Sequence, residues 1–264
     1  MHNSTPVVPF KTRLAAGELV RIFCVGRLVH PVLFDVHGMV GGYHGIWLDQ
    51  EHCSVTYEQI ALASACCRAN GLDSFVRMPL TSYANATANL EAGAGGLMAA
   101  RVESAAQAEE FMTWAKCAPR GRRGMNTSGF DALYGGKSLA ELGAESNRES
   151  FVAIQIETPG ALAECDAIAA IDGVDLLFLG PSDMSQELGI LGQWEHPQLW
   201  AAYEKVAAAC AKHGKHWGTI AVNPSHARRT HEMGCRMLSF GIDAVILRRG
   251  VEATRTMFGD LFTR

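Results

Sequence analysis

Short, nearly continuous apolar runs alternate along the chain with longer segments whose apolar residues recur at helical spacing. The runs are bounded by glycine, proline and polar residues, a pattern that predicts buried strands. Each run is followed by a segment able to form a helix, so the repeating unit is a strand and a helix. Eight strands are expected, at residues 19–25, 44–49, 74–78, 95–99, 151–157, 174–180, 216–222 and 236–241.

Repeated strand–helix units predict a parallel sheet that helices cover on both faces. Two helix starts are well marked: Thr56 precedes a helical pattern that Gly71 ends, and Ser104 precedes another that Pro119 stops. Eight units favour a closed (β/α)8 TIM barrel over an open doubly wound sheet. We therefore expect α/β architecture, with residues 1–264 forming a single domain.

Residues 119–150 interrupt this rhythm between the fourth and fifth predicted strands. They are rich in glycine and charge. A connection this long in a compact domain is usually functional or mobile, and we expect a loop here.

Composition excludes several classes of protein. The content of 48% hydrophobic and 19% charged residues is that of a globular chain. A net charge of -4, without a run of basic residues, argues against nucleic acid as a partner, and no apolar run is long enough for a membrane span. The eight cysteines include no CxxC pair, and residues 1–14 lack the apolar core of a signal peptide. We expect a cytoplasmic protein with free thiols.

Functional side chains of a barrel enzyme lie where the strands end and in the loops that follow. Four predicted strand ends carry such side chains, and the opposite ends show no similar density. The sets are Asp49-Gln50-Glu51-His52 after the second strand, Arg77 in the third, Gln155 and Glu157 in the fifth, and Gly180-Pro181-Ser182-Asp183 after the sixth.

Glu157 and Asp183 come from adjacent strands, so their carboxylates can converge on one hard cation. Carboxylate ligands suit magnesium or manganese better than zinc, which prefers imidazole and thiolate. Structural alternatives remain for each residue: Asp183 could cap a helix, Arg77 could form an ion pair, and His52 could be a surface histidine. The clustering of all four sets at one end of the predicted barrel favours a functional site.

At these residues the chain resembles the HpcH/HpaI aldolase family, the class II pyruvate aldolases related to citrate lyase. The matching segments include WLDQEH (47–52), VRMP (76–79), VAIQIET (152–158) and GVDLLFLGPSDMSQELGILGQWEHP (173–197). The most similar types act on 2-dehydro-3-deoxyglucarate and hydroxyheptenedioate. The resemblance implies a barrel of the phosphoenolpyruvate/pyruvate-binding type. It also implies metal-dependent, reversible cleavage of a 4-hydroxy-2-oxo acid to pyruvate and an aldehyde, through a pyruvate enolate held by the metal.

The resemblance also implies how the pyruvate half is held. Glu157 and Asp183 would bind a divalent cation, magnesium or manganese first, with cobalt or zinc as other options. Gln155 would contact a metal-bound water or the substrate. The backbone of one turn would bind the substrate carboxylate: Gly180, Pro181, Ser182 and Asp183.

Further catalytic roles follow from the same resemblance. His52 would be the base, and Arg77 would bind the pyruvate carboxylate or oxo group. Asp49 belongs to the same catalytic cluster. Glu91 falls where the family has an acidic residue that partners the histidine across a subunit or loop contact. None of the six lysines lies inside a predicted strand, which argues against a Schiff-base mechanism.

Several departures from the family leave the aldehyde open: Gln50, Arg27 and the loop 125–136. The same enolate would also serve an oxaloacetate decarboxylase or an enzyme like macrophomate synthase. A CoA-ester lyase and a non-catalytic oxo-acid-binding barrel are further alternatives. A homo-oligomer, trimer or hexamer, is expected by resemblance, with the C-terminal helix exchanged between subunits. Packing of that helix on its own barrel would explain its amphipathic pattern equally well.

Overall fold

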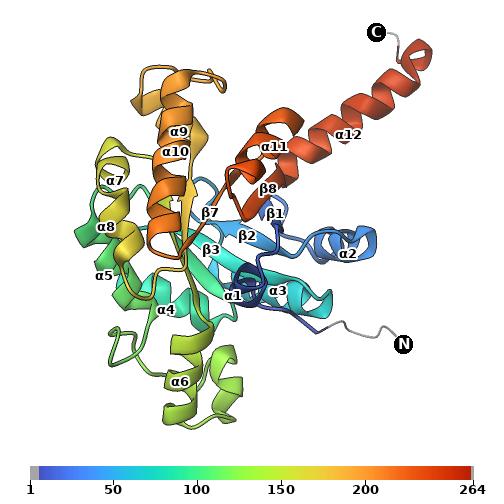
Figure 1. Ribbon diagram of the computed structural model, residues 1–264. Helices are drawn as coiled ribbons and strands as arrows, with labels where there is room; N and C mark the ends of the chain where they lie inside the picture. Colours follow the sequence, from blue (N-terminus) through green and yellow to red (C-terminus); the bar gives the residue numbers. More distant parts are fainter. Residues whose placement is uncertain (1–5, 263–264) are drawn as a thin grey trace.

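The computed structural model describes residues 6–262 and contains a closed barrel of parallel strands (Figure 1). Each strand pairs with its neighbours in sequence, and β8 closes on β1. All eight predicted strands and the predicted barrel are confirmed. The strands are β1 Val20–Val25, β2 Gly45–Asp49, β3 Asp73–Pro79, β4 Gly96–Ala100, β5 Phe151–Ile156, β6 Leu176–Leu179, β7 His216–Ile220 and β8 Met237–Ile242.

Helices surround the barrel (Figure 1). The predicted caps are present: Thr56 and Gln59 form a capping box, and the Ser104 hydroxyl accepts from the amide of Gln107. The helices are α1 Phe10–Ala15, α2 Pro31–Val40, α3 Tyr57–Ala69, α4 Tyr83–Glu91, α5 Ala105–Ala115, α6 Leu139–Glu149, α7 Pro159–Ala163, α8 Cys165–Ala170, α9 Pro181–Glu187, α10 Pro197–Lys212, α11 Pro224–Glu232 and α12 Asp243–Met257, with 3-10 turns η1 Phe130–Gly135 and η2 Gly259–Leu261. No helix in residues 6–262 is long and apolar enough to cross a membrane.

Alternate residues of the strands fill two separate apolar cores. One set packs outward against the helices, whereas the other fills the inside of the barrel. Phe10 of α1 closes the end at which the strands begin, with its ring centroid 5.7 Å from those of both Phe75 and Phe151. Trp47 and Phe75 point into the barrel. Because every second residue of a strand faces the same side, Asp49 and Arg77 are the next residues of these strands to point inward.

The prediction of a loop over residues 119–150 is wrong for its second half. Residues 139–149 form α6, which starts at a capping box of Ser138 and Glu141. The Ser-x-x-Glu spacing was a readable signal of this helix. The prediction gave more weight to the glycine and charged residues of this segment, because α6 has few apolar residues. Only Leu142 and Ser146 of this helix are buried.

Helix α12 leaves the barrel instead of packing along it (Figure 1). Its first residue, Asp243, is anchored: the carboxylate accepts from the amides of Gly26, Arg27 and Leu28 at 3.0, 2.7 and 2.7 Å. From Ala244 onward no residue of α12 is buried, and Val251 is 61% exposed. Within the described residues, therefore, α12 does not pack on its own barrel.

Replacing Phe10 with alanine should lower the free energy of unfolding by about 3–5 kcal/mol, because it empties the closed end of the barrel. Tyr134→Ala removes an aromatic ring that is 75% exposed and should change it by less than about 0.5 kcal/mol. Denaturant titrations of the two variants measure the difference. A cost below about 1 kcal/mol for Phe10→Ala would show that the ring does not close the core.

Candidate active site

The ends of β2 and β3 are joined by a buried ion pair. The Asp49 carboxylate accepts from Nε of Arg77 at 3.1 Å and from Nη2 at 2.7 Å. Both residues are at most 5% exposed, and the guanidinium carbon lies 4.7 Å from the ring centroid of Trp47. This bidentate geometry fixes the plane of the guanidinium.

Asp49 also shapes the loop that follows β2. Its Oδ1 accepts from the amides of Glu51 and His52, at 2.9 and 3.3 Å. Burial by itself raises the pKa of Asp49, but the hydrogen bonds and charge of Arg77 and these two amides outweigh it and hold the pKa below its usual value. Asp49 is thus a carboxylate at neutral pH that positions its neighbours.

Glu51 and His52 extend this cluster towards solvent. Nη1 of Arg77 lies 2.9 Å from Oε2 of Glu51, and Nε2 of His52 lies 3.7 Å from the same oxygen. The His52 side chain is 59% exposed. Arg27, one of the departures from the family, donates from Nη2 to the carbonyl of His52 at 3.0 Å, so it lies beside this cluster. An imidazole at this place can reach a ligand and exchange a proton with water.

Glu157 follows β5 and is fully buried. Its Oε1 accepts from the amide of Arg101 at 2.7 Å, and its Oε2 accepts from the side-chain amide of Gln155. Burial raises the pKa of Glu157 to about 7 and outweighs the lowering by the hydrogen bond from the Arg101 amide, while the charges of Glu51 and Asp183 raise the pKa further.

Gly180 and Asp183 complete the site from the β6 side. A Cβ on Gly180 would lie 2.6 Å from Oε2 of Glu157 and 2.8 Å from Nε2 of Gln155, so only glycine fits there. Gly180 is the N-cap residue of α9, with Pro181 and Ser182 in its first turn. Asp183 lies in the same turn and is not the cap, so the alternative of a capping role does not hold.

The residues present suit a hard divalent cation. Glu157 and Asp183 are the two carboxylates, and Oε1 of Gln155 is buried without a hydrogen-bond partner. In residues 6–262 no three His, Cys, Asp or Glu side chains are grouped to hold a metal ion. Two carboxylates leave coordination positions for water and substrate oxygens, as magnesium requires.

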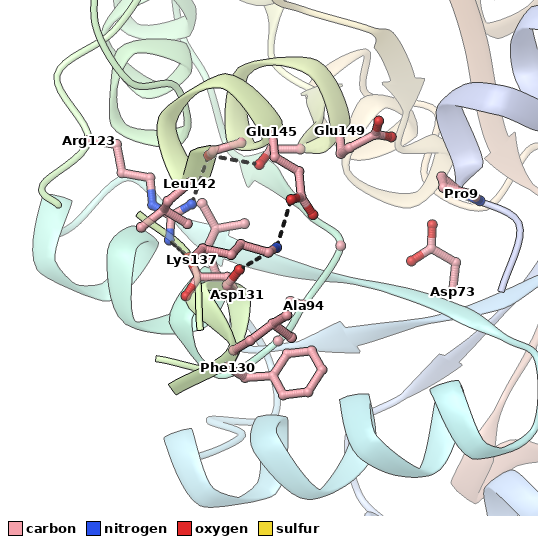
Figure 2. A pocket seen from close by; sticks show the side chains of 16 residues that line it. Pro9, Asp73, Ala94, Arg123, Phe130, Asp131, Lys137, Leu142, Glu145 and Glu149 are labelled. Atoms are coloured by element: carbon pink, nitrogen blue, oxygen red, sulfur yellow. Dashed lines mark hydrogen bonds and ion pairs between the residues drawn. The ribbon is translucent and has the colours of Figure 1, made fainter. Parts of the chain in front are cut away.

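Glu91 is the one predicted site residue that lies elsewhere. It ends α4, at the opposite end of the barrel, where its Oε2 accepts from Asn126 at 3.0 Å. Near it a cavity of about 270 Å³ lies beside the starts of β3 and β4 (Figure 2). Two ion pairs lie in that cavity: Lys137 lies 2.7 Å from Glu145, and Arg123 contacts Asp131. The structure does not bring Glu91 to His52 of the same chain.

The sequence interpretation missed Arg101. This residue directly follows β4, and the end of that strand was not among the four strand ends at which functional side chains were predicted. Its guanidinium lies 3.8 Å from Asp183 and 3.3 Å from Glu187. The readable signal was its position: a charged residue immediately after an apolar run.

The closed barrel and its polar end define a class of protein, a TIM-barrel lyase with an acidic site at the ends of the strands. The chain belongs to the HpcH/HpaI aldolase/citrate lyase family, which residues 38–249 match. The predicted family and the predicted class of enzyme are confirmed.

Similar proteins span nearly the whole chain. The 5-keto-4-deoxy-D-glucarate aldolase of Klebsiella pneumoniae is 30% identical over 98% of this chain and 99% of its own length. A solved HpcH/HpaI aldolase from Desulfitobacterium hafniense superposes with a TM-score of 0.86, at 30% identity, over 94% of this chain and 97% of its own. Macrophomate synthase, at 20% identity and a TM-score of 0.79 over 100% of this chain and 94% of its own, shares the fold.

Asp49→Asn should lower the free energy of unfolding by about 2–3 kcal/mol, since it leaves the buried Arg77 without its counter-ion. The double variant with Arg77→Met should lose less than the sum of the single variants. Asp172→Asn, which breaks an ion pair whose carboxylate is 88% exposed, should have almost no effect. Additive losses in the double-mutant cycle would show that the pair is not coupled.

Proposed function

We propose that this protein is a divalent-metal-dependent aldolase that cleaves a 4-hydroxy-2-oxo acid to pyruvate and an aldehyde, and catalyses the reverse addition. The observation that carries the proposal is the convergence of Glu157 and Asp183 beside Gln155, at the end of the barrel that holds Arg77 and His52. Membership of the family indicates the class of reaction, and these side chains would bind the metal and the substrate and take the proton.

Glu157 and Asp183 would hold the cation, which we propose is magnesium or manganese. A divalent cation supplies Lewis-acid stabilisation of the negative charge that develops on the 2-oxo group. Gln155 supports this site in two ways: its amide nitrogen donates to Glu157, and its buried oxygen is free to accept from a water or a hydroxyl.

Arg77 and the turn after β6 would bind the pyruvate half. Two of the donor nitrogens of Arg77 are committed to Asp49, and Nη1 faces Glu51, so the guanidinium is held rigidly and has donors left for the substrate. Within the turn Gly180–Asp183, the amides of Ser182 and Asp183 at the start of α9 would hold the carboxylate, because the amide of Gly180 donates to the carbonyl of Ile156 and Pro181 has no N–H. Such rigid placement reduces the ordering required when the substrate binds.

His52 would take the proton. In cleavage, Nε2 accepts the proton of the C4 hydroxyl, the C3–C4 bond breaks, and its electron pair passes to pyruvate as the enolate. The aldehyde leaves, and protonation at C3 gives pyruvate. The neighbouring carboxylate of Glu51 stabilises the protonated imidazole. Decarboxylation of oxaloacetate needs no hydroxyl deprotonation, so His52→Ala should impair aldol cleavage more than that reaction.

We propose that the protein assembles through α12, as a trimer or hexamer. A cavity of about 470 Å³ lies beside β8 and α11, where the apolar side chains of Leu19, Leu238 and Phe240 are joined by the polar ones of Arg228, His231 and Arg249. The projecting α12 presents exposed Ile246, Leu247 and Val251. We propose that the α12 of a second copy occupies this cavity, and that assembly would let Glu91 of one copy meet His52 of another.

Glu157→Gln and Asp183→Asn should each lower pyruvate release at least about a hundredfold, because each removes one anionic metal ligand. They should also weaken Mn²⁺ binding, measured without substrate by calorimetry. Asp166→Asn alters an exposed ion pair away from the site and serves as control. Cleavage that survives in either variant, or in the presence of a chelator, would contradict the metal mechanism.

Val251→Asp should dissociate the assembly, because it places a charge on the apolar face of α12. Light scattering should then report a single-chain mass, while circular dichroism remains that of a folded barrel. Activity should fall as well, since Glu91 could no longer reach another copy. Glu252→Gln, on an exposed polar position of the same helix, should leave the mass unchanged. An unchanged mass for Val251→Asp would rule out exchange through this face.

A further inference from the structure

Arg101 has an unusual backbone for a residue with a long side chain. Its φ is +51°, in the left-handed region that favours glycine. Its amide N–H donates to Oε1 of Glu157 at 2.7 Å, and this hydrogen bond stabilises the left-handed conformation. The backbone of Arg101 is therefore fixed to the proposed metal site, and its side chain leaves from a defined point on the rim.

The guanidinium of Arg101 is less committed than that of Arg77. Nη1 is 3.8 Å from Oδ1 of Asp183, and Nη2 is 3.3 Å from Oε1 of Glu187. These are single, long contacts, and the side chain is 45% exposed. Arg77 is 6% exposed and bound bidentately. Arg77 is thus an internal cation of the site, whereas Arg101 keeps donors that face solvent.

Exposure rises in steps from the floor of the site to its rim. Glu157 is fully buried, the Asp183 side chain is 30% exposed, and that of Arg101 is 45% exposed. A substrate whose 2-oxo acid end lies at the two carboxylates extends its other end towards this rim. In a 4-hydroxy-2-oxo acid that other end is the aldehyde half.

Charge balance leaves Arg101 available to a ligand. When Asp183 serves a divalent cation, its charge is shared with that cation, and its attraction for the arginine weakens. Glu187, itself 29% exposed, is then the carboxylate outside the proposed metal site that forms an ion pair with Arg101. A guanidinium with free, forked N–H donors is suited to a planar carboxylate.

We propose that Arg101 is a specificity-determining residue that binds an anionic group, a carboxylate, at the far end of the aldehyde half of the substrate. This inference rests on the proposed aldolase function. It assigns to this chain a preference for aldehydes that carry a terminal carboxylate over neutral aldehydes of the same length. Glu187 holds the guanidinium near the rim until that group arrives.

The test compares addition of pyruvate to two four-carbon aldehydes, 4-oxobutanoate and butanal, with Mn²⁺ at saturation. Wild-type protein should prefer 4-oxobutanoate in kcat/KM. Arg101→Leu should lower kcat/KM for 4-oxobutanoate roughly ten- to a hundredfold, mainly through KM, because a charged hydrogen-bond partner is lost. For butanal the change should stay within about threefold, and Arg101→Lys should fall between wild type and Arg101→Leu.

Two controls separate this role from others. Arg122→Leu removes an exposed arginine paired with Glu110 and should leave both aldehydes unaffected. Mn²⁺ affinity of Arg101→Leu, measured without substrate, should equal or exceed that of wild type, because a neighbouring cation has been removed. A weaker Mn²⁺ affinity with equal loss for both aldehydes would overturn the proposal and make Arg101 a support of the metal site.

The outcomes also separate this inference from the function on which it rests. If wild type adds pyruvate to both aldehydes and Arg101→Leu changes them equally, the aldolase function stands and the specificity role falls. If wild type shows no preference for 4-oxobutanoate, the specificity role falls as well. If wild type adds pyruvate to neither aldehyde and releases none from any 4-hydroxy-2-oxo acid, both proposals fail together.

Discussion

The buried pair of Asp49 and Arg77 is the interaction on which the arrangement of the site depends. One carboxylate joins β2 to β3, fixes the plane of the arginine, and accepts the amides of the loop that carries Glu51 and His52. Asp49 therefore positions both the Arg77 guanidinium, which would face the substrate, and the His52 imidazole, which would take the proton of the substrate. A buried ion pair adds little net stability over apolar residues, so orientation is its more important contribution.

The interior of the barrel supports this pair from below. Phe10, Phe75 and Trp47 form a continuous column, with centroid distances of 5.7 and 6.3 Å, and the guanidinium of Arg77 lies over Trp47. The column excludes water from one side of the arginine and so strengthens its attraction to Asp49. The phase of the strands dictates this arrangement, because inward positions that are apolar near the strand starts become polar at the strand ends.

Strand positions, helix caps and the paired carboxylates could be predicted from the sequence because their causes are local. Apolar runs, capping residues and strand-end polarity each act within a few residues. The course of α12 could not be predicted, because the same amphipathic pattern allows a helix to pack on its own barrel or on that of a neighbouring subunit. Glu91 is a related case: within one chain it ends α4 at the end of the barrel opposite His52, so its predicted contact with the histidine depends on a second subunit and stays a prediction.

Arg101 shows a third kind of limit. Its role depends on a left-handed backbone that directs an amide to Glu157, and no residue type other than glycine or asparagine signals such a turn. In this turn the side chain lies beside Asp183 and Glu187 and is 45% exposed. The residues that would bind the pyruvate half and Arg101 are thus held in place by different interactions. The inner set is fixed by burial and mutual hydrogen bonding, which tolerate little change. Arg101 is held mainly through its backbone amide, with only long side-chain contacts to Asp183 and Glu187, so its guanidinium can move to meet the aldehyde half.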